Sequence, residues 1–158
     1  MRSLINYIFK LFSFFKILKL YLETKKFESV FKNNTCEISH NVKYYNSSNI
    51  FLGKEIFFGD NVLLNAAKGG TITIGDNTSL ASDVKILSWI KDSDEKNREI
   101  KIIKKDVKIG RYCRLGYNVI IMPGVNIGDN VKISPSSVVA SDVPSNSIVL
   151  GNPAEIIS

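Results

Sequence analysis

Histidine and carboxylate side chains in this 158-residue sequence are candidates for proton transfer. The single histidine, His40, has the side chain that titrates nearest to neutral pH, which suits a general base. A charged segment at 87–102 carries the carboxylates Asp92 and Asp94. Either carboxylate could accept a proton if desolvation raised its pKa. Whether these groups act depends on the elements that hold them.

The only two cysteines, Cys36 and Cys113, are too few and too far apart in sequence for a disulfide framework or a metal site. Cys113 falls on an inward position of the repeat described below, so we interpret it as a small core residue and not as a nucleophile. We therefore expect no metal. Unpaired cysteines suit a reducing cytosol, and we expect a cytoplasmic protein.

Composition indicates one ordinary domain, with 44% hydrophobic and 23% charged residues. The net charge is +6, but residues 1–32 hold seven of the bases and only two acids, so most of the excess lies at one end. The rest of the chain is nearly neutral. This uneven distribution argues against a nucleic-acid partner.

Residues 1–31 are predicted to form an amphipathic helical segment. Polar residues recur every three or four positions opposite a wide face of Phe, Leu and Ile. Lysines at 10, 16 and 19 interrupt the apolar run, which disfavours a transmembrane helix. Two alternatives stay open for the apolar face. It packs on the protein or on a neighbouring subunit, or residues 1–28 make a peripheral contact with an anionic membrane.

Beyond about residue 34 an aliphatic residue recurs every six positions, and a second small or apolar residue follows four places after each. The first row is Ile103, Ile109, Leu115, Ile121, Ile127, Ile133 and Val139. The second row is Val107, Cys113, Val119, Val125, Val131 and Ser137. Two earlier runs have the same spacing: Leu52, Phe58 and Leu64, and then Ile74, Leu80 and Ile86. An insertion around Lys68 offsets the second run from the first.

Turn-forming residues separate these inward positions. The triplet Gly-Asp-Asn occurs at 59–61, 75–77 and 128–130. We expect Gly and Asn to adopt positive φ at tight corners, and Asp to bond locally to the backbone.

Six residues are enough for a short strand and a corner, so the chain is predicted to coil as a prism. Three units complete one turn, and successive parallel rungs lie about 4.8 Å apart. This solenoid would occupy residues 32–158, with an excursion loop at about 87–102 and a C-terminal tail at about 141–158.

The Ile-Gly-Asp-Asn-Val units, Val143-Pro144 and the ending Gly151-Asn152-Pro153-Ala154 resemble the hexapeptide-repeat acyltransferases, in particular the sugar and serine acetyltransferases. The resemblance covers most of residues 38–158. It implies an all-β fold, a left-handed parallel β-helix, assembled as a homotrimer. It also implies that acetyl-CoA lies in the groove between adjacent subunits.

In the acetyltransferases that the sequence resembles, the loop after the equivalent of Val84-Lys85-Ile86 carries a histidine base. The excursion here contains no histidine, and Lys91 or Asp92 falls near the expected position. Three explanations stay open. Asp92 or Asp94 is the base, or the acceptor is an amine that needs none, or the protein has kept the fold and lost the activity. His40 is interpreted as an outward corner residue.

The resemblance also implies where the pantetheine arm of the cofactor lies. The matching positions are Gly116, Tyr117, Ser134, Pro135, Ala140 and Ser141. Pro135 lacks one backbone donor, and Ser141 replaces a common lysine.

Ten basic residues lie between positions 85 and 114. They could bind CoA phosphates or a nucleotide- or lipid-linked sugar, or they could simply lie exposed on the outer faces of the prism. Trp89 either stacks on a sugar ring or anchors the loop.

The sequence thus predicts an acetyl-CoA-dependent O- or N-acetyltransferase. Its acceptor would be a sugar of a surface polysaccharide or the nucleotide- or lipid-linked precursor of one. The alternative is a catalytically silent solenoid that serves as a scaffold or binding protein.

Overall fold

The computed structural model describes residues 11, 14–15, 17–19, 21–22, 25–31, 35–93 and 100–158. The chain divides into two compact units, Met1–Asn33 and Asn34–Ser158. In the first unit, the described residues between 11 and 30 have helical backbone. Within the described part of the chain, no helix combines the length and the hydropathy that crossing a bilayer requires.

The second unit is built mostly of short parallel strands in three sheets, with one 3-10 turn, η1 (Ser47–Asn49). The seven-stranded sheet contains β1 (Glu37–Ile38), β4 (Phe57–Phe58), β7 (Ser79–Leu80), β12 (Arg114–Leu115), β15 (Lys132–Ile133), β17 (Ile148–Gly151) and β18 (Ala154–Ile156). The five-stranded sheet contains β2 (Lys43–Tyr45), β5 (Leu63–Asn65), β8 (Lys85–Leu87), β13 (Ile120–Ile121) and β16 (Val138–Val139). The four-stranded sheet contains β3 (Ile50–Leu52), β6 (Ile72–Ile74), β11 (Val107–Ile109) and β14 (Asn126–Ile127).

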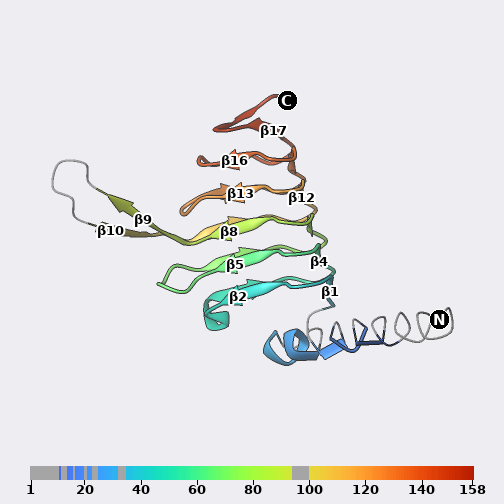
Figure 1. The fold of residues 1–158 in the computed structure, drawn as a ribbon. Helices are drawn as coiled ribbons and strands as arrows, with labels where there is room; N and C mark the ends of the chain where they lie inside the picture. The colour runs from blue at the N-terminus through green and yellow to red at the C-terminus, as the bar shows by residue number, and fades with distance from the viewer. Residues whose placement is uncertain are drawn as a thin grey trace, which may run out of the picture. The chain divides into compact units, whose positions relative to one another are not determined.

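The chain visits the three sheets in turn, and each circuit forms one coil stacked on the one before (Figure 1). We call the connection from the seven- to the five-stranded sheet corner 1, the next connection corner 2, and the connection back to the seven-stranded sheet corner 3. In the last coils 116–118 and 134–136 lie at corner 1, 140–142 at corner 2, and 110–112 and 128–130 at corner 3. Residues of the same corner in successive coils therefore stack on one another.

The inward positions of the repeat form the core of this unit. From position 107 onward every predicted inward side chain is at most 4% exposed, including Cys113 and Ser137. Phe58, Leu64, Leu80 and Ile86 continue the same core in the earlier coils. Ile103 was predicted to belong to this row, but it lies outside the coils, in the strand β10 (Ile100–Lys104), and is only half-buried.

The expectation for corner glycines was wrong. Asn61, Asn77 and Asn130 adopt positive φ, as predicted, but the glycines two residues before them do not. Those glycines are required because the next coil lies directly against them. A Cβ on Gly59, for example, would lie 2.6 Å from the backbone nitrogen of Ser82.

The corner aspartates also differ from the expectation of local bonding. The Asp60 carboxylate accepts a hydrogen bond from the backbone N–H of His40 in the preceding coil, with a donor–acceptor distance of 2.9 Å. Asp76 accepts one from Lys54 in the same way, at 2.7 Å. These carboxylates therefore join successive coils.

The excursion predicted as a loop is a β-hairpin in its described part. β9 (Trp89–Ser93) pairs antiparallel with β10, and the hairpin leaves the stack at corner 2 (Figure 1). At the C-terminal end of the stack, β18 folds back antiparallel onto β17. Both departures from the parallel pattern coincide with breaks in the six-residue period.

Candidate functional site

The root of the hairpin is held to the coils by hydrogen bonds. Ser88 is fully buried, and its hydroxyl donates to the carbonyl of Gly69 at 3.2 Å. The backbone N–H of Lys105 donates to the Ser88 carbonyl at 3.0 Å, which closes the base of the excursion. The Trp89 indole N–H donates to the Asn65 side-chain oxygen at 2.8 Å. Trp89 therefore anchors the hairpin, which was one of its two predicted roles.

Asn65 is a residue that the sequence analysis missed. It lies at the end of β5, next to the inward Leu64, and its Cα pairs with Leu87 one coil later. A polar side chain at the end of the strand, one coil before the period breaks, is the signal that could have identified it.

The two candidate bases differ in how far the structure describes them. Asp92 lies on β9, is exposed, and has Lys101 as its cross-strand Cα partner. Asp94 lies outside the described residues. In a single chain Asp92 is open to water, so the desolvation that would make it an effective base must come from a bound acceptor or a neighbouring subunit.

His40 lies far from this hairpin, at corner 1 of the first coil. Its Nδ1 is 3.4 Å from the Asp60 carboxylate. The pKa of Asp60 is lowered, first by the hydroxyl of Ser39, which donates to it, and then by the backbone N–H of His40. This cluster links two coils and places no basic nitrogen near Asp92.

Four of the six residues predicted to contact the cofactor stack together at corner 1. Gly116 and Tyr117 belong to one coil, and Ser134 and Pro135 to the next, where the Ser136 N–H donates to the Tyr117 carbonyl at 2.8 Å. Tyr117 is 63% exposed. A Cβ on Gly116 would lie 2.7 Å from the backbone nitrogen of Pro135, so coil stacking by itself explains this glycine.

The other two, Ala140 and Ser141, are exposed at corner 2 of the last full coil. They are separated from Pro135 by the rest of the turn and by strand β16 (Val138–Val139). The outer face between the two corners carries the half-buried, Cα-paired side chains of Leu63, Lys85, Ile120 and Val138. An elongated and partly apolar ligand could therefore touch both groups.

The carboxylates of Asp106, near corner 2, and Asp129, at corner 3, accept hydrogen bonds from backbone N–H groups. The pKa of Asp106 is lowered because its carboxylate accepts hydrogen bonds from Thr71. The pKa of Asp129 is lowered, first by the backbone N–H of Arg111 and then by the Arg111 side chain.

Burial raises the pKa of the Cys113 thiol, which agrees with a core role. Within the described part of the chain, no cluster of three or more His, Cys, Asp or Glu could hold a metal ion.

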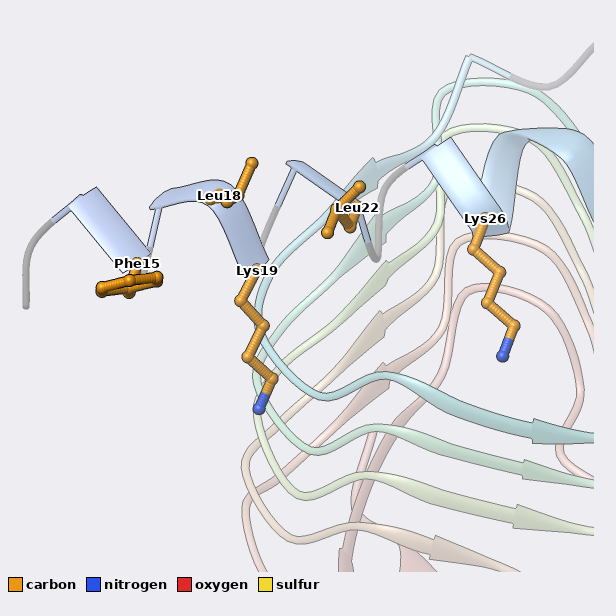
Figure 2. Close-up of a pocket in the computed structure, with 5 residues that line it drawn as sticks. All are labelled: Phe15, Leu18, Lys19, Leu22 and Lys26. Atoms are coloured by element: carbon orange, nitrogen blue, oxygen red, sulfur yellow. The ribbon is translucent and has the colours of Figure 1, made fainter.

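The helical unit presents a separate apolar surface. Its exposed side chains include Phe14, Phe15, Ile17 and Leu22, each at least 58% exposed. An open hollow of about 350 Å³ is lined by Phe15, Leu18, Lys19, Leu22 and Lys26 (Figure 2). Lys19 and Lys26 extend on the same side of the segment.

Comparison with known proteins places these features in context. A sequence profile described as "Bacterial transferase hexapeptide (six repeats)" matches residues 102–141. Galactoside O-acetyltransferase of Escherichia coli is 30% identical over 142 residues, covering 85% of this chain and 69% of that protein. A putative lipopolysaccharide biosynthesis O-acetyl transferase of Escherichia coli is 35% identical over 116 residues, or 65% of this chain, and the chain spans only 59% of its length.

Among solved structures, a hexapeptide-repeat acetyltransferase from Vibrio cholerae, complexed with acetyl coenzyme A, superimposes with a TM-score of 0.73. Its sequence is 26% identical, and the match covers 86% of this chain and 76% of that chain.

Proposed function

Because the chain belongs to the hexapeptide-repeat acetyltransferases, we propose that it transfers acetyl from acetyl-CoA to a hydroxyl or amine of a sugar. The acceptor sugar would be part of a surface polysaccharide or of its nucleotide- or lipid-linked precursor. The observation that carries this proposal is the similarity over 85% of the chain to a galactoside O-acetyltransferase. Relatives named for lipopolysaccharide and colanic acid biosynthesis support the polysaccharide.

The proposed donor site is the outer face of the five-stranded sheet between corners 1 and 2. Gly116, Tyr117, Ser134 and Pro135 would hold one end of the pantetheine arm, and Ala140 and Ser141 the other. The apolar Leu63, Ile120 and Val138 on this face fit the methylene groups of such an arm. A left-handed winding of the coils and a homotrimer, in which an adjacent subunit closes this groove, belong to the same proposal.

Bound acetyl-CoA would supply an activated thioester. In this proposal the Asp92 or Asp94 carboxylate accepts the proton of the acceptor hydroxyl, which increases the nucleophilicity of its oxygen. Trp89, fixed by Asn65, would orient the hairpin that carries these carboxylates. With an amine acceptor in its neutral form, no base is needed for attack, and the hairpin would serve only to position the acceptor.

The helical unit would hold the enzyme at an anionic membrane surface, where a lipid-linked acceptor is located. Exposed Phe15 and Leu22 would enter the headgroup region, while Lys19 and Lys26 stay near the phosphates. The five excess positive charges of residues 1–32 support this orientation.

Calorimetric titration of the full-length protein with acetyl-CoA and CoA tests the activity before any acceptor is known. We expect saturable binding with micromolar affinity. No binding at millimolar ligand would overturn the enzyme assignment. The absence of histidine from 87–102 favours a second candidate, a silent scaffold, and that result would support it.

A further inference from the structure

Two like charges lie next to each other on the outer face of the seven-stranded sheet. Arg114 on β12 and Lys132 on β15 are Cα partners in adjacent parallel strands, and both are exposed. Adjacent strands are about 4.8 Å apart, and like charges in direct register destabilise a sheet. Neither side chain forms an ion pair or hydrogen bond with the residues that the structure describes.

On the same two coils, another arginine has a carboxylate as its neighbour one coil later. Arg111 lies three residues before Arg114, and its neighbour one coil later is Asp129, whose Oδ2 is 2.9 Å from the Arg111 Nη2. The chain spacing is the same in both cases, but the partner of Arg114 is a base. Within the part of the chain that the structure describes, no carboxylate neutralises the Arg114–Lys132 pair, so the pair is open to an anion from outside the chain.

The location of the pair suggests where that anion comes from. β12 leads directly into Gly116 and Tyr117, and β15 into Ser134 and Pro135. The pair thus lies beside the part of corner 1 that is proposed to hold the donor arm. Tyr117, two residues after the end of β12, is also exposed at this corner.

We propose that Arg114 and Lys132 bind one phosphate or carboxylate group of the acceptor, so that the acceptor is an acidic sugar. This inference rests on the proposed function. A guanidinium can hold such a group through two parallel N–H donors, and an ammonium adds a point charge.

The test is calorimetric titration of four full-length proteins with inorganic phosphate and, separately, with acetyl-CoA. The proteins are the wild type, Arg114→Gln, Lys132→Gln and a control, Lys108→Gln. Lys108 is exposed on the four-stranded sheet, and its partner in the next coil is the neutral Asn126. The control thus removes one positive charge from a face that has no like-charged pair.

We expect the wild type and Lys108→Gln to bind phosphate equally, and the other two variants to bind it at least about tenfold more weakly. The acetyl-CoA affinity should be the same in all four proteins. The proposal is overturned if the wild type binds no phosphate, or if the two variants bind it as well as the wild type does. A parallel loss of acetyl-CoA affinity would assign the pair to the donor phosphates and would also overturn it.

A fifth variant shows that a loss of phosphate binding does not come from misfolding. Lys132→Asp places beside Arg114 the same partner that Arg111 has in Asp129, so it should raise the melting temperature while abolishing phosphate binding. A wild type that binds phosphate but not acetyl-CoA would overturn the proposed enzyme activity and leave the anion site standing.

Discussion

Arg111 and Asp129 are joined across two coils by three hydrogen bonds to one carboxylate. The Arg111 backbone N–H donates to Oδ1 at 2.7 Å, while Nη2 and Nε donate to Oδ2 at 2.9 and 3.3 Å. Backbone bonds of the same kind join Thr71 to Asp106 and Asn126 to Asp142. Corner carboxylates thus hold the coils in register at several heights of the stack.

Asp129→Asn is expected to lower the melting temperature at neutral pH and to leave it unchanged in acid. The substituted amide can still accept the Arg111 backbone bond but carries no charge. Because the pKa of Asp129 is lowered in the folded protein, its ionised form stabilises the fold above the unfolded pKa of about 3.9. This contribution is lost as the pH falls through the lower, folded pKa.

Thermal unfolding of wild type and variant at about pH 7 and about pH 2 measures this difference. Glu155→Gln, which removes an exposed charge from the terminal hairpin, is the matched control and should show no difference at either pH. An Asp129→Asn effect of equal size at both pH values would contradict the electrostatic explanation.

Much of the fold could be predicted because burial has a period. Ile109, Leu115 and Ile121 recur every six residues, and each fills the interior of one side of the prism. The role of the corner residues could not be predicted, since it depends on the neighbouring coil. Gly59 is required because Ser82 of the next coil lies against it, and Asp60 bonds to His40 of the preceding coil. Both neighbours are about twenty positions away in the sequence, so the residues of one corner do not predict them.

Gly116→Ala should destabilise the protein without any ligand present. The added Cβ would meet the backbone nitrogen of Pro135 at 2.7 Å and the Ile133 carbonyl at 2.9 Å, and neither backbone atom can move away easily. Overpacking of this kind costs about 1–3 kcal/mol. Urea unfolding measures this loss.

Tyr117→Ala is the control for Gly116→Ala, because that side chain is 63% exposed at the same corner. It should change the free energy of unfolding by less than about 0.5 kcal/mol. If Gly116→Ala is as stable as the wild type, the glycine is not required by coil stacking.

The candidate site was less predictable than the fold. The spacing of inward residues located the excursion, but its hairpin pairing and the Trp89–Asn65 bond depend on contacts between separate coils. The coil length predicts that Arg114 and Lys132 are neighbours. That this pair has no opposite charge becomes evident only by comparison with Arg111, which forms an ion pair with Asp129. A repeat therefore predicts which residues are neighbours more readily than what their side chains do together.

Asp92→Asn is expected to lower kcat/KM for acetyl transfer to a sugar hydroxyl by at least about a hundredfold, if Asp92 is the general base. CoA release would be followed across pH, because loss of a base also removes the acid limb of the pH profile. Glu155→Gln is the matched control and should retain full activity. A fully active Asp92→Asn with an inactive Asp94→Asn would move the role to Asp94, and two active variants would exclude a carboxylate base.

Removing the apolar surface of the helical unit should release the protein from anionic membranes. The double variant Phe15→Ser, Leu22→Ser replaces two side chains that are each 58% exposed, so the hydrophobic contribution to binding is lost while the lysines remain. Co-sedimentation with vesicles of phosphatidylserine and phosphatidylcholine measures the bound fraction.

Deletion of residues 1–28 should reduce vesicle binding as the double variant does, and Tyr112→Ser, which replaces an exposed aromatic of the coils, should leave it unchanged. Because Lys19 and Lys26 contribute through charge, wild-type binding should also weaken as salt shortens the Debye length. Undiminished vesicle binding by the double variant would overturn the membrane contact, and a change of its oligomeric state in solution would show that this surface packs against protein instead.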